Sequence, residues 1–274
     1  MSKRLSKTPI GIFDSGVGGL SILAELEKVM PAEHYIYFGD TKNLPYGNKN
    51  PDEIIKFGEE IMTFFVTKGV QHVVVACNTS SAISYDILRT RFPNIKIYPL
   101  IQNVAPVLAK YNSLAILATE GTVNSLKYTS EIKKYNKNAE VFEIPCDGFV
   151  EIVENGLYDS PSTLELIDMR LEGLPDVQKI VLGCTHYPYL LDVLDKFIDK
   201  ENFINPAKIF VKKVQEDIER ENQGVIFDLP KKEFYVSADP EKFIQNAKIF
   251  YDVQEEVHLA WRIFFKLYDN FIEN

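Results

Sequence analysis

The stretch HVVVACNTS, residues 72–80, combines the features that decide the fold. Three valines and an alanine form a short, uninterrupted apolar run, which is typical of a strand covered on both faces in a parallel sheet. The run ends at Cys77, and the polar residues that follow it, Asn78 to Ser80, are of the kind that begin helices. The stretch therefore predicts a strand-to-helix turn of an α/β protein, with a thiol at the carboxyl end of the strand.

A second stretch, IVLGCTHYP at residues 180–188, repeats this pattern. Here an apolar run leads through a glycine to Cys184, and polar residues follow. The chain holds three cysteines, and these two lie in matching positions 107 residues apart. The stretch LAILATEGTV (114–123) also resembles IGIFDSGVGG (10–19), at a nearly equal offset of 104 residues. Two features that repeat in the same order at nearly one offset predict two α/β halves of similar plan.

The surrounding sequence adds further elements. We predict strands at 9–14 and 34–40, and these alternate with helices at 19–30 and 51–69. Strand and helix in alternation indicate an α/β fold with mainly parallel sheets. We therefore expect two similar α/β domains, with the active site in the cleft between them.

The C-terminal part of the chain is expected to return to the first half. The sequence EFYVSA (233–238) predicts a strand, and apolar residues at helical spacing from Val257 to Phe271 predict an amphipathic helix. The expected first domain is 1–98 with 211–274, the second is 99–210, and the hinge strands lie near 97–104 and 203–210.

Composition and charge limit the classes of function. Hydrophobic residues make up 46% and charged residues 25% of the 274 residues, as in water-soluble globular proteins. We find no apolar run of the ~20 residues that a membrane span needs, no secretory signal and no disulfide framework, so we expect a cytoplasmic protein without a membrane partner. The net charge of −9 argues against a nucleic-acid partner, but it leaves a small anionic ligand possible.

Several residues that could carry chemistry follow predicted strands. Ligands of open α/β sheets bind outside the carboxyl ends of the strands, and Asp14, Asp40, Cys77, Thr119 and Cys184 all lie where a predicted strand stops. If the two halves face each other, Cys77 and Cys184 lie on opposite walls of one cleft. A bound small molecule would then have one thiol on each side.

Each of these residues also has a structural interpretation. A thiol at a helix N-terminus has a lowered pKa and can act as nucleophile, base or metal ligand, but a free cysteine is often a small buried hydrophobe. The matched pair favours chemistry, whereas Cys146 has no such twin and is predicted to be structural. His186 could orient or protonate a neighbouring group or simply be structural, and Asp14 could cap a helix or act as an active-site carboxylate. Without a C-x-x-C or a complete G-x-G-x-x-G pattern, we expect no metal and no cofactor.

Six short motifs occur together in one order along the first 190 residues. They are DSGVGG (14–19), YFGD (37–40), PYG (45–47), ACNT (76–79), ATEGT (118–122) and GCTHYP (183–188). Together they resemble bacterial glutamate racemase. The resemblance implies an isomerase with two α/β domains that interconverts L- and D-glutamate without a cofactor. It further implies a homodimer that supplies D-glutamate for peptidoglycan, and hence for cell wall biogenesis and cell shape.

The resemblance also implies roles for individual residues. Cys77 and Cys184 would be the two acid/base thiols, with Asp14 and His186 assisting them. Glu154 in CDGFVEIVE would be a further catalytic residue, with Glu151 as the alternative. The implied substrate-binding residues are Asp14, Ser15, Tyr46, Gly47, Asn78, Thr79, Thr122, Thr185 and His186.

The chemistry explains why two thiols are needed. Inverting an α-carbon requires removal of a proton from one face and delivery of a proton to the other, which two groups on opposite faces can do. A thiol suits this role because its ordinary pKa of ~8.5 lies close to neutrality. We expect Asn78, Thr79 and Thr185 to hold the α-carboxylate region, and Asp14 and Ser15 to face the ammonium group.

Three other functions remain open from the sequence. One is racemisation of another amino acid such as aspartate, which differs from glutamate by one methylene, worth ~1–3 kcal/mol in a pocket. Another is a hydrolase or transferase that uses a single cysteine as nucleophile, with His186 as its base. The third is a binding protein that keeps the fold without catalysis.

Overall fold

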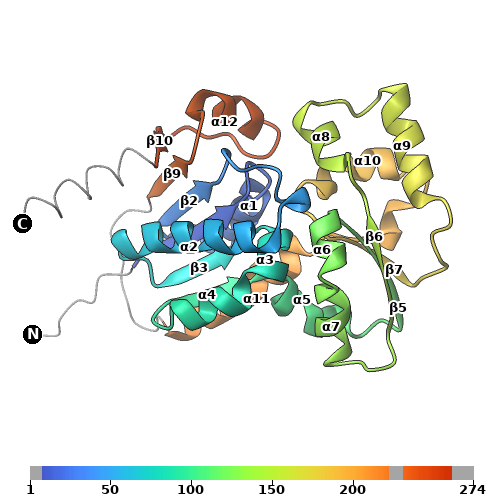
Figure 1. Cartoon of the computed structure of the whole chain (residues 1–274), viewed down its shortest axis with the longest axis horizontal. Helices are drawn as coiled ribbons and strands as arrows, with labels where there is room; N and C mark the ends of the chain where they lie inside the picture. The colour runs from blue at the N-terminus through green and yellow to red at the C-terminus, as the bar shows by residue number, and fades with distance from the viewer. Residues whose placement is uncertain (1–7, 222–230, 261–274) are drawn as a thin grey trace, which may run out of the picture.

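The computed structural model describes residues 8–221 and 231–260, which form two parallel sheets side by side (Figure 1). The first sheet has six strands in the order β10-β9-β2-β1-β3-β4, and the second has four in the order β6-β5-β7-β8. Every strand pair in both sheets is parallel. The predicted α/β class is therefore confirmed.

The strands of the first sheet are β1 (Ile10–Asp14), β2 (Tyr35–Gly39), β3 (His72–Val75), β4 (Lys96–Pro99), β9 (Lys232–Val236) and β10 (Val257–Leu259). Those of the second sheet are β5 (Ser113–Ala118), β6 (Glu140–Pro145), β7 (Lys179–Leu182) and β8 (Phe203–Ile204). The α-helices are α1 (Leu20–Val29), α2 (Pro51–Thr67), α3 (Asn78–Ile83), α4 (Tyr85–Arg91), α5 (Leu100–Leu108), α6 (Glu120–Asn124), α7 (Lys127–Lys133), α8 (Phe149–Glu154), α9 (Pro161–Leu171), α10 (Leu191–Leu194), α11 (Ala207–Glu221) and α12 (Pro240–Ala247). Three short 3-10 helices are η1 (Tyr46–Asn48), η2 (Tyr187–Leu190) and η3 (Lys200–Asn202).

The two sheets repeat one strand order. In the first, β1 lies between β2 and β3, and β4 follows β3. In the second, β5 lies between β6 and β7, and β8 follows β7. Strand β1 therefore corresponds to β5, and β3 to β7, as the matched sequence stretches predict. The two cysteine-bearing turns thus occupy equivalent places in the two halves.

Alternating side chains of the first sheet pack into two separate cores. Ile12 and Val74 point to the face covered by α1 and α11, whereas Phe13 and Val75 point to the face covered by α2 and α4. Successive residues of a strand point to opposite faces, so an uninterrupted apolar run is what a sheet covered on both sides requires. The first of these cores continues into the second sheet, where it includes Ile116. The two halves therefore share one apolar core.

Helix α2 has a defined start and end. The Asn50 side chain accepts a hydrogen bond from the backbone N–H of Asp52, and the Glu53 carboxylate accepts one from the backbone N–H of Asn50. This reciprocal capping stabilises the first turn. Beyond the last turn, Gly69 has a φ of 70°, a left-handed conformation that favours glycine.

The C-terminal segment differs from the prediction. Strand β9 pairs with β2 and β10 pairs with β9, so both extend the first sheet. Val257–Leu259 is therefore a strand and not the start of a helix, because the free edge of β9 offers it backbone hydrogen-bond partners. The rest of the predicted helix, 261–271, lies outside the described residues. The segments expected as hinge strands also differ, because each continues from a short strand, β4 or β8, into a helix, α5 or α11.

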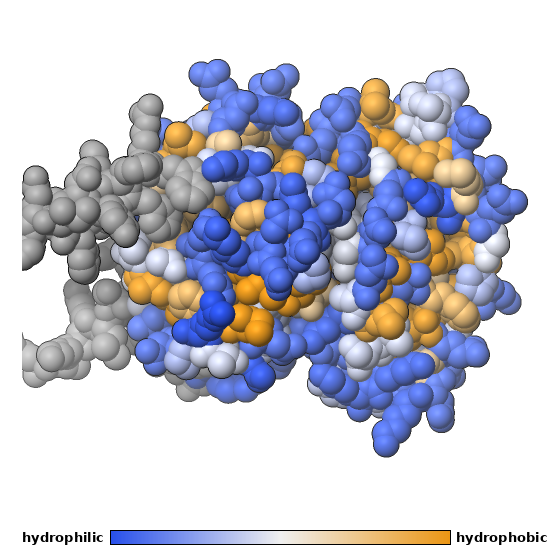
Figure 2. Space-filling model, in the orientation of Figure 1, coloured by the Kyte–Doolittle hydropathy of each residue, from blue (hydrophilic) through white to orange (hydrophobic). Residues whose placement is uncertain are grey.

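The surface drawn in Figure 2 carries hydrophilic residues over much of both halves, with hydrophobic patches between them. Among the residues that the structure describes, no helix has the length and apolarity needed to span a membrane.

Candidate active site

The two matched cysteines lie at the carboxyl ends of equivalent strands and line one cavity. Cys77 follows β3 and precedes the first residue of α3, and Cys184 follows β7. Both thiols are buried, with 5% and 8% of their surface exposed. The cavity between them measures about 20 Å³, roughly the space that one water molecule needs. The site is therefore closed in this structure.

Most of the predicted substrate-binding residues line this cavity. Those present in its wall are Ser15, Tyr46, Gly47, Asn78, Thr79, Thr185 and His186. Asp14, Thr122 and Glu154 lie behind the wall and contact residues that form it. Four wall residues were not among the predicted site residues: Leu44, Pro45, Thr119 and Val150.

The thiol of Cys77 is held in its protonated form. Complete burial, together with the nearby negative charge of Asp14, raises the pKa of Cys77 to about 12. Its Sγ lies 3.8 Å from the Ser15 hydroxyl, to which it donates. The sequence predicts a lowered pKa from the helix N-terminus, and this prediction is wrong for Cys77. The first turn of α3 does supply a backbone N–H from Ser80, but loss of solvent outweighs it.

The surroundings of Cys184 are different because an imidazole lies beside it. The Nδ1 atom of His186 is 3.8 Å from Cys184 Sγ, and its Nε2 atom is 3.0 Å from Glu154 Oε1. Burial lowers the pKa of His186, but the hydrogen bonds to Cys184 and Glu154 and the charge of Asp14 outweigh it and raise this pKa to about 10. His186 is therefore a cation at neutral pH, and its positive charge lies beside the Cys184 sulfur. Cys184 itself begins a turn before η2 and not a helix.

Asp14 links the two halves behind the cavity. Its Oδ1 accepts a hydrogen bond from the backbone N–H of Gly16, and its Oδ2 accepts one from the Thr185 hydroxyl at 3.4 Å. Burial raises the pKa of Asp14, and the neighbouring His186 opposes that rise. The carboxylate thus holds the glycine-rich turn, but it does not cap helix α1, which begins after Gly19 without a side-chain cap, so the capping interpretation is wrong. The carboxylate also places a charge at the site, as the functional interpretation requires.

Asn78 offers the cavity an unused hydrogen-bond donor. Its Oδ1 accepts from the Tyr128 hydroxyl of the second half at 2.7 Å. Its Nδ2 is buried and has no hydrogen-bond partner in the part of the chain that the structure describes. A buried donor without a partner is costly, so such groups are usually satisfied by a ligand or water. Beside it, the hydroxyls of Thr79, Thr119 and Thr122 lie 3.0–3.3 Å from one another and join the two halves.

Asp40 holds the loop that carries Tyr46 and Gly47 through hydrogen bonds to its carboxylate. Its carboxylate accepts hydrogen bonds from the Tyr46 hydroxyl at 2.5 Å and from the hydroxyl of Ser237, just after β9, at 2.6 Å. The Asn43 amide donates to both of its oxygens. Asp40 was recognised only as a residue at a strand end. Two of its partners, Asn43 and Tyr46, are close in the sequence, whereas Ser237 comes from a distant part of it.

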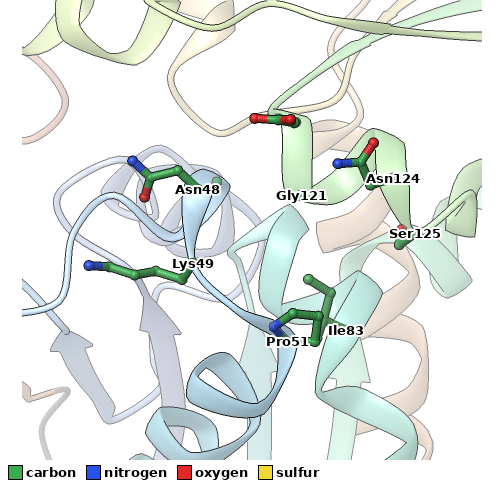
Figure 3. A pocket seen from close by; sticks show the side chains of 9 residues that line it. Asn48, Lys49, Pro51, Ile83, Gly121, Asn124 and Ser125 are labelled. Atoms are coloured by element: carbon green, nitrogen blue, oxygen red, sulfur yellow. The ribbon is translucent and has the colours of Figure 1, made fainter.

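Two of the larger pockets in the described part of the chain share lining residues with the closed cavity. One, of about 280 Å³, is shown in Figure 3, where Asn48 and Lys49 lie on one side and Asn124 and Ser125 on the other. The other, of about 370 Å³, is lined by acidic residues that include Glu151, the alternative to Glu154. Gly47 of the first half and Gly121 of the second approach each other closely. An added Cβ on Gly121 would lie only 2.9 Å from the Gly47 carbonyl oxygen, so glycine allows the two halves to come together here. Within 8–221 and 231–260, no cluster of three or more His, Cys, Asp or Glu side chains could hold a metal.

Comparisons with known proteins agree with the resemblance read from the six motifs. The family model described as Asp/Glu/hydantoin racemase matches residues 10–214. Glutamate racemase from Carboxydothermus hydrogenoformans is 39% identical over 247 residues, which cover 88% of this chain and 91% of that protein. Glutamate racemase from Picosynechococcus sp. is 36% identical over 244 residues, which cover 88% and 87%.

A solved structure agrees as well. The crystal structure of glutamate racemase from Francisella tularensis in complex with D-glutamate matches with a TM-score of 0.86 and 32% identity, over 93% of this chain and 97% of that one. The fold, the paired thiols and these matches lead to one assignment: the chain belongs to the Asp/Glu/hydantoin racemase family.

Proposed function

We propose that this protein is a glutamate racemase that interconverts L- and D-glutamate with two thiols and no cofactor. The observation that carries the proposal is that Cys77 and Cys184, one from each half, line a single closed cavity. Relatives at 36–39% identity over most of the chain are glutamate racemases, which supports glutamate as the substrate.

We infer the starting roles of the two thiols from their different surroundings. Cys184, beside the His186 cation, acts first as the base and takes the α-proton from one face of the substrate. Cys77, held as a thiol by burial, delivers its proton to the opposite face. After one turnover the protonation states are exchanged. The enzyme then runs the reverse reaction from that form, or its thiols exchange protons with water and return to the starting form.

The developing negative charge on the substrate needs donors that are already in place. Asn78 Nδ2 is such a donor, because it is buried, unpaired among the described residues and part of the cavity wall. Ser15 lines the cavity, with Asp14 behind it, and supplies a polar surface for the ammonium group. Since a cavity of about 20 Å³ is much smaller than glutamate, the substrate binds when the two halves move apart.

The proposal also covers cellular role and assembly. D-glutamate made by this reaction supplies peptidoglycan synthesis in the cytoplasm, and the enzyme is a homodimer. These statements are supported by the family resemblance. Sedimentation velocity of the purified protein tests the dimer directly. The cellular role is tested by depleting the gene product: the cells should lose their shape, and added D-glutamate should restore it.

Isotope exchange tests the reaction. Purified protein is incubated in deuterated water with L-glutamate and, separately, D-glutamate, without added cofactor, and optical rotation and α-deuterium are followed together. We expect inversion in both directions with deuterium in the product. Cys77→Ser and Cys184→Ser should each lose about 10³-fold in rate, whereas Cys146→Ser should stay close to wild type. Folded protein that neither inverts nor exchanges glutamate would refute the proposal.

The same assay decides between the remaining alternatives. Aspartate, offered at equal concentration, should react far more slowly than glutamate; faster reaction would move the assignment to aspartate. Mass spectrometry of the protein after turnover should find no covalent adduct on either cysteine. An adduct on one thiol, with the other dispensable, would instead support a single-nucleophile enzyme.

A further inference from the structure

The catalytic histidine is in contact with the C-terminal segment of the chain. His186 belongs to the second half, after β7, but the ring of Phe250, after α12, lies against it. Their ring centroids are 5.3 Å apart and the planes are nearly perpendicular, at 79°. Phe250 is itself held by Tyr189, whose ring centroid lies 4.4 Å away and whose hydroxyl donates to the Phe250 carbonyl oxygen at 3.5 Å.

A second contact reaches His186 through Glu154. The Asn246 side chain, on α12, donates from Nδ2 to Glu154 Oε2 at 3.5 Å. The other oxygen of the same carboxylate lies 3.0 Å from His186 Nε2. Helices α12 and α8 face each other across the seam between the halves (Figure 1). Asn246 therefore fixes the rotation of the Glu154 carboxylate from the far side of that seam.

The remaining sides of the imidazole are also occupied. Its Nδ1 lies near Cys184 Sγ and the Thr185 hydroxyl. On the side of the first half, Gly18 packs so closely that an added Cβ would lie 2.5 Å from His186 Cε1. The ring is thus held by contacts from both halves as long as the C-terminal segment stays in place.

We propose that Asn246 and Phe250 are positioning residues, which hold His186 in the orientation that pairs it with Cys184. The inference rests on the proposed function, because it gives this pairing a role in proton transfer. Neither residue touches the cavity. The C-terminal segment extends the first sheet, whereas His186 belongs to the second half, so the pairing is complete only when the halves are together. Closure of the two halves thereby also assembles the base.

The charged and titratable groups that face His186 are Cys184, Glu154 and Asp14. Of these, Glu154 is the one that Asn246 contacts. With the Asn246 amide removed, the carboxylate is free to rotate toward solvent, and the imidazolium loses part of its stabilisation. His186 should then lose its proton at a lower pH than in the wild type.

The test combines kinetics with direct titration of the imidazole. Asn246→Ala should lower kcat about fivefold, ~1 kcal/mol at 1.36 kcal/mol per tenfold, with KM for glutamate within about twofold. The alkaline limb of its pH profile of kcat/KM should move to lower pH. The titration of His186, followed by NMR on protein labelled with ¹⁵N-histidine, should move in the same direction. Asn246→Gln, which keeps the amide, should restore part of each effect.

The chain offers a matched control for each position. Gln245→Ala changes the exposed neighbour on α12, and Ile249→Leu changes the exposed neighbour of Phe250. Both should behave as wild type, whereas Phe250→Leu should lower kcat about threefold, less than a shift of the catalytic groups by a full ångström costs. Thermal unfolding of every variant identifies any general loss of stability.

The outcomes separate the inference from the proposed function. Asn246→Ala and Phe250→Leu that match their controls in kcat and in the His186 titration would overturn the inference. Two results together would support the contact but refute the function: His186 loses its proton at a lower pH in Asn246→Ala than in the wild type, and the wild type does not racemise glutamate. Loss of kcat without any shift of the titration would also overturn the inference, because it indicates a role other than holding the imidazole.

Discussion

The close approach of Gly18 to His186, which the proposed mechanism places beside the base, allows a quantitative prediction for Gly18→Ala. A Cβ at this position would lie 2.4 Å from Thr185 Oγ1, 2.5 Å from His186 Cε1 and 2.6 Å from His186 Nδ1. Non-bonded atoms of this kind prefer separations near ~3.5 Å. The imidazole and the Thr185 hydroxyl must therefore retreat by about 1 Å.

Such a displacement has a known order of cost. Misplacing a catalytic group by about 1 Å lowers the rate by roughly 10²-fold, which corresponds to ~2.7 kcal/mol in the activation free energy. Overpacking should also lower the free energy of unfolding by about 1–3 kcal/mol. We therefore expect a folded protein with kcat near one hundredth of the wild-type value.

Gly16→Ala is the matched control because it adds the same methyl group to the same turn. Its Cβ would meet the flexible Leu44 side chain at 3.1 Å and lie 3.7 Å from Glu154 Oε1, which are far milder contacts. Initial rates by circular dichroism with each enantiomer give kcat and KM, and thermal melts report folding. We expect Gly16→Ala to stay within about threefold of wild type. Equal losses in the two variants, or a Gly18→Ala enzyme within threefold of wild type, would refute the argument from close packing.

Three further predictions follow from the same site. The pKa of His186 is raised to about 10 in the folded protein, above its ordinary value near ~6.5, so its protonation stabilises the fold fully below about pH 6.5 and this contribution is lost as pH rises through 10. In urea titrations, the stability difference between wild type and His186→Asn should therefore shrink from pH 6 to pH 10; a constant difference would contradict it. Asp40→Asn should raise KM about tenfold and lower the free energy of unfolding by about 1–3 kcal/mol, because Asp40 accepts the hydrogen bonds from the hydroxyls that fix the loop of Tyr46. Asp239→Asn, which makes the same change at an exposed helix cap, is the control for KM. Tyr128→Phe removes the donor to the buried Asn78 Oδ1 and should raise KM about fivefold and lower the free energy of unfolding by about 1–3 kcal/mol, and an unchanged KM would show that Asn78 does not need this anchor.

The sequence is informative wherever the structure depends on local pattern. Apolar runs that stop at a small or polar residue located β1, β3, β5 and β7, since burial on both faces of a parallel sheet leaves no room for polar side chains. Cys77 and Cys184 occupy matching positions because the strands they follow, β3 and β7, have equivalent places in the repeated strand order. Placing both on one cavity required that carboxyl ends of parallel strands lie at one edge of each sheet and, in addition, that the two halves face each other.

Properties that arise between distant segments had no such local signal. Asn246 and Phe250 lie in an ordinary amphipathic segment, and nothing in their spacing indicates contact with Glu154 or His186. The predicted lowering of the Cys77 pKa was wrong for a related reason. Its helix N-terminus can be read from the sequence, but the complete burial that dominates its titration depends on how the two halves close. The short strand at Val257 was missed because its partner, β9, supplies the edge that a helical pattern does not reveal.

The unequal surroundings of the two thiols place a limit on how this enzyme can be asymmetric. L- and D-glutamate have the same free energy in water, so their equilibrium constant is one, and the two values of kcat/KM must be equal whatever the protein does. The cation beside Cys184 and the buried, protonated Cys77 therefore cannot favour one direction at low substrate concentration. They can only change kcat and KM together. In the mechanism proposed above, Cys184 acts first as the base, so the enantiomer whose α-proton faces Cys184 binds to an enzyme that is ready to react. The other enantiomer needs the form with the protonation states exchanged. The two substrates should accordingly differ in KM, with kcat differing by the same factor in the same direction.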